Sequence, residues 1–93
     1  MALFAVTYRY EDAQSQDREA NKPAHREWLA AGVAEGAIAT VGPFVDGSGA
    51  LLLVDADDDE AARDFVNRDP HCVKGLVSEI TVRGWMPVYG ALA

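Results

Sequence analysis

The sequence predicts an α+β domain in which a four-stranded antiparallel sheet carries two helices on one face. Three observations support this fold class. The chain has 93 residues, the size of one small domain. Four stretches rich in β-branched and aromatic residues alternate with two helical patterns, in the order strand, helix, strand, strand, helix, strand. The turn-forming residues 46–49 join the two middle strands into a hairpin.

The first strand and the segment after it differ in composition. Residues 3–10 are aromatic, aliphatic and β-branched, with no charged side chain before Arg9. Residues 11–22 are polar and contain no large apolar side chain. We therefore expect a strand at 3–10, followed by an exposed connection with at most a helical turn near residues 17–20.

The first helix is predicted over residues 23–35. Pro23 suits the first helical position, because the N–H that proline lacks would have no partner there. Apolar or small residues then recur at spacings of three and four, at Trp28, Leu29, Gly32 and Val33. Gly36 is expected to end the helix in a left-handed conformation.

The second half of the chain repeats this order. Strands are predicted at 37–45, with an interruption at Gly42-Pro43, and at 50–54. A helix follows to about Arg68. Asp57 and Asp58 are its candidate N-caps, and Glu60 stands three residues after Asp57, as in a capping box. Asp69-Pro70 ends it.

A loop at 71–75 and a final strand at 76–88 complete the predicted elements. Gly84 and Pro87 indicate a bulge or an edge position for that strand. The whole order is the split βαβ arrangement of the ferredoxin-like fold, a βαββαβ sandwich. One face of its sheet has no helix to cover it, and so short a chain has a small core. We expect that face to pack on a second copy in a homodimer.

The charge of the chain limits its partners. Fifteen acidic residues against eight basic ones give a net charge of −7 and a pI near 4.5, which disfavours binding to nucleic acid and to anionic membranes. No apolar run is long enough to span a bilayer, and the N-terminus lacks the features of a signal peptide. The single cysteine, Cys72, allows no internal disulfide. We therefore expect a cytoplasmic protein.

Three short patterns occur in a fixed order along the chain. They are Arg18 followed by Pro23-Ala24-His25, then Glu35-Gly36 followed by Val41-Gly42-Pro43, and then Asp69-Pro70 ahead of Gly75-Leu76. Together they resemble the YCII (YciI-like) family of the dimeric α/β-barrel superfamily. The resemblance implies a single YCII-like domain over residues 1–93, a sheet packed on its twin, and an active-site pair at His25 and Asp69. It also implies elimination, isomerisation or related acid/base chemistry on small, often cyclic compounds. The short loop 46–49 and the histidine at position 71 depart from the family pattern.

The residue types at the implied pair suit proton transfer. His25 is the third residue of the predicted helix, where the helix dipole favours a neutral imidazole, the form that a general base needs. An aspartate bonded to one ring nitrogen would fix the tautomer and direct the other nitrogen to the substrate. The alternative is that His25 lies on the helix surface and that Asp69 only stops a helix.

Further residues are candidates for substrate binding. Arg18 would bind a carboxylate or phenolate, unless it is simply solvated. Gly42 and Pro43 would bring backbone N–H groups near a ligand, unless they only bend the strand. We also assign His71 to this group. With His25 and Asp69 it has the composition of a metal-binding facial triad, but the spacing matches no metal motif, so neither metal nor cofactor is expected.

These observations leave three functional hypotheses. The first is a small, cofactor-independent enzyme of elimination or isomerisation, in which His25 moves a proton of a small, cyclic or aromatic organic substrate and Asp69 orients it. The second is a binding or accessory module that holds a ligand without turnover. The third is cofactor-free monooxygenase-like chemistry, which other dimeric α/β-barrel proteins perform.

Overall fold

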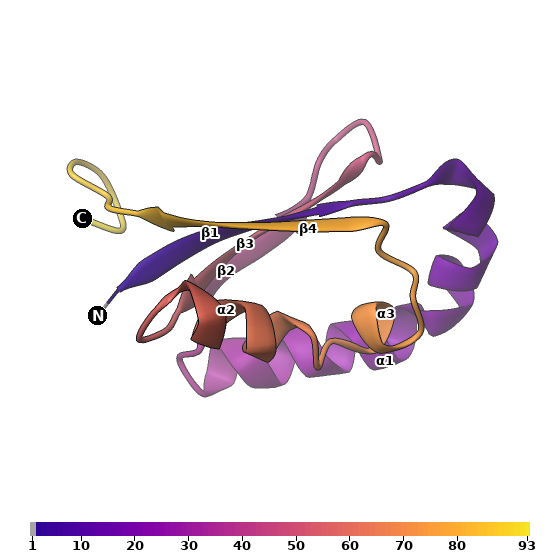
Figure 1. Cartoon of the computed structure of the whole chain (residues 1–93), viewed down its shortest axis with the longest axis horizontal. Coiled ribbons are helices and arrows are strands. Elements are labelled where there is room, and N and C mark those ends of the chain that lie inside the picture. Colours follow the sequence, from indigo (N-terminus) through magenta and orange to yellow (C-terminus); the bar gives the residue numbers. More distant parts are fainter. Residues whose placement is uncertain (1) are drawn as a thin grey trace.

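The computed structural model describes residues 2–93, and its elements alternate as a split βαβ fold requires (Figure 1). In chain order these elements are β1 (Leu3–Arg9), the 3₁₀ turn η1 (Asp12–Gln14), α1 (Ser15–Ala34), β2 (Ile38–Pro43), β3 (Gly49–Asp55), α2 (Asp59–Val66), α3 (Pro70–Val73) and β4 (Glu79–Trp85). No helix among these residues is long and apolar enough to cross a membrane.

The four strands form one antiparallel sheet in the order β2-β3-β1-β4. This confirms the predicted ferredoxin-like fold. The helices lie together on one side of the sheet, and no helix of residues 2–93 covers the other side (Figure 1). Pro43 lies in β2, an edge strand that pairs with β3 on one side only. An edge strand tolerates the N–H that proline lacks. The edge position predicted for the final strand is also correct.

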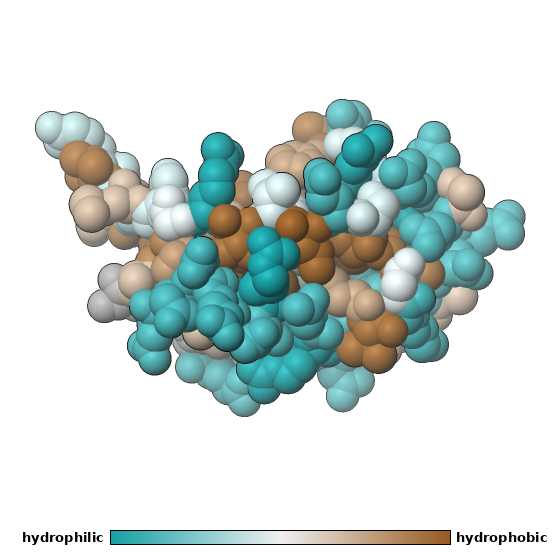
Figure 2. Space-filling model, in the orientation of Figure 1, coloured by the Kyte–Doolittle hydropathy of each residue, from teal (hydrophilic) through white to brown (hydrophobic). Residues whose placement is uncertain are grey.

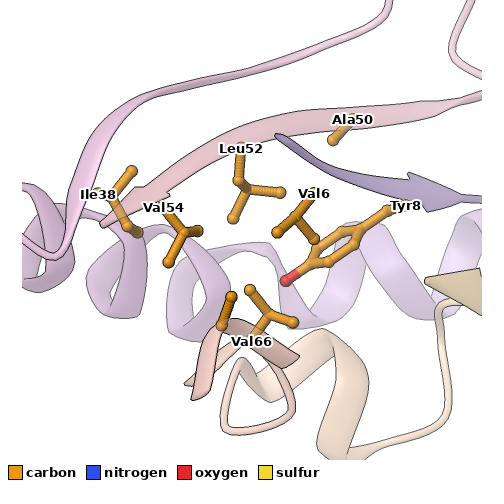
Figure 3. Packing of buried hydrophobic residues seen from close by; sticks show 8 residues of the cluster. Val6, Tyr8, Ile38, Ala50, Leu52, Val54 and Val66 are labelled. Carbon is orange, nitrogen blue, oxygen red and sulfur yellow. The ribbon is translucent and has the colours of Figure 1, made fainter. Parts of the chain in front are cut away.

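The hydrophobic core lies between the sheet and the helices. Alternate residues of the central strands point to this side, because side chains of a strand alternate between its two faces. Figure 3 shows Val6 and Tyr8 of β1 and Leu52 of β3 meeting Val66 of α2, with the Tyr8 hydroxyl directed toward the helices. In Figure 2, hydrophobic residues form a band between the sheet edge and the hydrophilic outer side of the helices. The core therefore places one polar atom, the Tyr8 oxygen, beneath the helical layer.

The prediction for the first helix was wrong at its start. Helix α1 begins at Ser15, so the segment predicted as a connection is helical and Pro23 lies inside the helix. An interior proline costs about 3 kcal/mol. Contacts with the distant segment 69–76 offset this cost: Gln14 Nε2 donates to the Gly75 oxygen, Arg18 to the Leu76 oxygen, and Asn21 to the His71 ring. The helix end was correct, since Gly36 adopts a φ of 81°.

The second half of the chain differs from the prediction at element ends. Helix α2 is capped by Asp58, one of the two predicted N-caps, whose carboxylate accepts the Ala61 N–H at 2.7 Å; the alternative capping box of Asp57 and Glu60 does not form. The helix ends at Val66. Residues 71–75 were expected as a loop, but Pro70 starts the short helix α3. The outer strands are shorter than predicted, and Pro87 lies beyond β4.

Candidate functional site

Asp69 is the buried centre of the site. It precedes Pro70 and caps α3, so its side-chain Oδ1 accepts the backbone N–H of His71 at 2.9 Å. Oδ2 accepts the hydroxyl hydrogen of Tyr8 at 2.9 Å, and Oδ1 also accepts a hydrogen bond from His25 Nδ1 at 2.7 Å. The side chain is fully buried. A carboxylate without water contact needs such donors, and Asp69 obtains them from a strand, a helix and its own turn.

His25 reaches Asp69 from the middle of α1. It is the eleventh residue of this helix, so the dipole argument based on a third position was wrong. The tautomer is set by Asp69 instead: because a carboxylate only accepts, Nδ1 carries the hydrogen and Nε2 of the neutral ring has a free lone pair. The His25 side chain is 12% exposed to solvent. His25 therefore has the orientation that a general base requires.

His71 lies directly against His25. The two rings stack with centroids 3.8 Å apart and planes within 3°. Asn21 Nδ2 lies 3.0 Å from His71 Nδ1 and donates to it. Burial, and then repulsion from the His25 ring when that ring is protonated, lower the pKa of His71 to about 4. His71 is therefore neutral at pH 7.

Two tyrosines complete the polar surroundings. Burial, and then the Asp69 charge, raise the pKa of Tyr8, so its phenol remains a donor to the carboxylate. The same two causes raise the pKa of Tyr10 to about 12. The Arg18 guanidinium lies 4.3 Å from the Tyr10 ring centroid, a cation–π contact. Burial also raises the pKa of the Cys72 thiol to about 11, so it is protonated at neutral pH.

A pocket of about 400 Å³ opens beside the histidines, between α1 and the β2–β3 hairpin. Its wall combines apolar side chains of α1, β2 and β3 with three positively charged side chains of α1 and one carboxylate, that of Glu19, which pairs with Lys22 at 3.1 Å. The wall is thus net positive, although the chain as a whole carries a net charge of −7. The residues that the sequence predicted and that line it are Arg18, His25, Gly42, Pro43 and His71. Asp69 lies behind His25 rather than in the wall.

Four other residues of the site were not predicted. Lys22 lines the pocket beside Arg18, and Asn21, Tyr8 and Tyr10 contact the predicted residues. A helix extended back to Ser15 would have placed Arg18, Lys22 and His25 on one face, because their spacings are four and three. The missed signal was therefore helical periodicity hidden by a polar composition and by Pro23.

His25, Asp69 and His71 also meet the composition of a metal site, since one potential ligand atom of each lies within 4.8 Å of the others. A metal ion lies in the plane of each imidazole that binds it. Because the two rings are parallel and stacked, one ion cannot lie in both planes. In addition, Nδ1 of each ring already has a hydrogen-bond partner. The geometry favours a hydrogen-bonded proton-transfer group over a metal centre.

The fold and this site define a class: small α+β proteins with a buried aspartate that orients a helix histidine at a pocket. The YCII-related domain matches residues 2–86, so the chain belongs to this family. A similar solved structure is 5-chloro-2-hydroxyhydroquinone dehydrochlorinase from Burkholderia phenoliruptrix AC1100, in complex with 2,5-dihydroxybenzoquinone. The two proteins are 25% identical, with a TM-score of 0.76, over 90% of this chain and 93% of the other. No curated protein matches the sequence.

Proposed function

We propose that this protein is a small acid/base enzyme that catalyses elimination or isomerisation on a small, acidic, hydroxylated aromatic or quinone compound. The observation that carries the proposal is the 2.7 Å hydrogen bond between His25 Nδ1 and the fully buried Asp69, at the wall of a pocket. The likeness to a dehydrochlorinase in complex with a dihydroxyquinone supports the substrate class. Membership of the YCII family agrees with the active-site pair that the sequence resemblance implies, His25 and Asp69.

The proposed chemistry needs one proton acceptor. His25 Nε2 takes a proton from the substrate hydroxyl, and the electron pair of the broken O–H bond forms a carbonyl π bond. In an elimination, His25 returns this proton to the ring carbon that bears the leaving group, which makes that carbon tetrahedral. His25 Nε2 then takes the proton of a second hydroxyl, whose O–H electron pair forms a second carbonyl. The ring electrons displaced in this step expel a leaving group such as chloride with its bonding pair. In an isomerisation, His25 returns the proton to another substrate atom. Asp69 stabilises the imidazolium that forms between these steps, because its carboxylate stays bonded to Nδ1–H.

The activity test compares the wild type with His25→Gln, using 5-chloro-2-hydroxyhydroquinone as substrate and chloride release as the readout. Glutamine retains a polar group of similar reach but lacks a basic ring nitrogen, so turnover is expected to fall by about 10²- to 10⁴-fold. Lys74→Gln is the control, because Lys74 is exposed and does not line the pocket. Binding of 2,5-dihydroxybenzoquinone without any chloride release by the wild type would instead support a non-catalytic binding module.

The positive charges of the pocket are proposed to select an acidic substrate. Arg18 is anchored by donating from Nη1 to the Glu11 and Leu76 oxygens at 3.0 and 3.4 Å, which leaves its other N–H groups for a ligand oxygen. Arg18→Gln is expected to weaken 2,5-dihydroxybenzoquinone binding by roughly 10-fold or more in calorimetric titration. Lys74→Gln makes the same change in charge outside the pocket and should keep wild-type affinity. Equal affinities in all three proteins would contradict a role for Arg18.

We also propose a homodimer through the helix-free face of the sheet. The strand register places Ala5 beside Leu53, and Thr7 beside Leu51 and Thr81, on this face. Trp85 at its edge is 43% exposed. A small domain gains stability when such a face is covered. Sedimentation at twice the 10.0 kDa chain mass is expected, and dilution-independent sedimentation as a 10.0 kDa particle would contradict the dimer.

A further inference from the structure

We propose that His71 is a second substrate-contacting residue, whose neutral ring is held by Asn21 in the Nε2–H tautomer and donates a hydrogen bond to a substrate oxygen. This inference rests on the proposed function, because it assigns a partner to the base His25. It makes the two stacked histidines a complementary pair, in which one ring nitrogen accepts and the other donates.

The first step concerns the tautomer of His71. Its Nδ1 receives a hydrogen bond from the Asn21 amide nitrogen, 3.0 Å away. An amide NH₂ only donates, so Nδ1 must present its lone pair and the hydrogen of the neutral ring lies on Nε2. Asn21 is 6% exposed and His71 is 4% exposed, so little water competes for this contact. Asn21 is therefore a positioning residue that acts through His71.

The second step concerns where the free ring nitrogens point. Among residues 2–93, no buried side-chain nitrogen or oxygen lacks a hydrogen-bond partner. Each histidine forms a side-chain hydrogen bond only through Nδ1, so both Nε2 atoms retain access to solvent. Both residues line the same pocket. The Nε2 lone pair of His25 and the Nε2–H of His71 are consequently the groups that these rings offer to a ligand there.

The third step concerns charge. After His25 accepts a proton, a second positive ring stacked on it would be strongly disfavoured. Burial and the His25 charge keep His71 neutral near pH 7, since they lower its pKa to about 4. A neutral imidazole N–H still stabilises a developing oxyanion in a desolvated site. His71 thus stabilises negative charge without adding a positive charge beside His25.

The two histidines together require two particular groups on the substrate. A hydroxyl gives its proton to His25 Nε2, and another oxygen on the same ring gains negative charge and accepts the hydrogen bond from His71 Nε2–H. This second oxygen is a carbonyl oxygen of a hydroxyquinone, or of the keto tautomer of a hydroxylated hydroquinone. The proton that leaves the substrate resides on His25, and His71 keeps its own. A hydroxyquinone carries both groups within one small ring. Aromatic compounds that carry a single hydroxyl and no second oxygen on the ring are expected to bind more weakly.

The tautomers are measured directly by ¹H–¹⁵N correlation of the imidazole rings. The chain has only two histidines, so the spectrum contains two ring systems and His71→Phe assigns them. At pH 7 we expect the Nε2–H pattern for His71 and an Nδ1-bonded hydrogen for His25. Asn21→Leu should leave His71 in place but allow both of its tautomers. An Nδ1–H or doubly protonated His71 in the wild type would overturn the inference, whatever the protein catalyses.

The donor role is measured by binding. His71→Phe keeps an aromatic ring that can stack on His25 but removes the N–H, so the affinity for 2,5-dihydroxybenzoquinone should fall roughly 10- to 100-fold. Asn21→Leu should produce a smaller loss in the same direction. Unchanged affinity in His71→Phe would overturn the donor role. Failure of the proposed function would look different: the wild type would keep the expected tautomers and the affinity loss in His71→Phe, but release no chloride from the chlorinated substrate.

Discussion

Asp69→Asn is expected to lower turnover by about 10²- to 10⁴-fold and the free energy of unfolding by about 1–3 kcal/mol. The two oxygens of Asp69 accept three hydrogens, from Tyr8, His25 and the His71 backbone. An asparagine has one oxygen and one NH₂ group, so whichever way it turns, a donor faces a donor. His25 then loses the acceptor that fixes its tautomer. Chloride release and urea unfolding measure the two effects.

Tyr8→Phe is the matched comparison for this variant. It removes only the hydroxyl that donates to Asp69 Oδ2 at 2.9 Å and leaves the His25–Asp69 hydrogen bond in place. We expect a similar loss of stability, because a buried carboxylate loses a donor, but a loss of turnover of less than about 10-fold. If Tyr8→Phe and Asp69→Asn reduced turnover equally, orientation of His25 by Asp69 would not explain the activity loss.

The fold was predictable because its signals are local. The strand at 3–10 contains uninterrupted apolar and β-branched residues, and the turn at 46–49 separates two such strands, so element order alone defined the split βαβ topology. The start of α1 was not predictable in this way. Its first half is polar and contains Pro23, and it is held by hydrogen bonds to residues about 50–60 positions later in the chain. Local propensity carries no information about such contacts.

The pairing of His25 with Asp69 was likewise not a property of local sequence. The residues are 44 positions apart, and the hypothesis came from the order of short patterns typical of a family. Lys22 and Asn21 were missed because they fell in the segment predicted as a connection. On the helix that actually forms, Lys22 shares a face with Arg18, and Asn21 lies one turn before His25. One wrong helix boundary thus concealed Lys22 in the pocket wall and Asn21 beside His71.

Wild-type stability is expected to fall as the pH decreases from about 6.5 to about 4, through His71. Burial first, and then the charge of His25, lower the pKa of His71 from 6.5 in an unstructured chain to about 4 in the folded protein. Between these values the unfolded chain binds a proton that the folded protein does not, so acid favours unfolding. The contribution is fully present above pH 6.5, and its loss amounts to at most about 3 kcal/mol. Arg18 and Lys22 act in the same direction, whereas Asp69 opposes them.

His71→Phe isolates this contribution, because the other ionisable groups of the site remain and only the ring that resists protonation is removed. Urea unfolding of both proteins at pH 7.5, 5.5 and 4.5 gives the difference in their free energies of unfolding. The wild type should lose stability relative to His71→Phe as the pH falls from about 6.5 to about 4. Above pH 6.5 the difference between the two free energies of unfolding should stay constant. Parallel curves would mean that His71 binds its proton equally well in the folded and unfolded chain, and Asn21 would then not be holding a neutral ring.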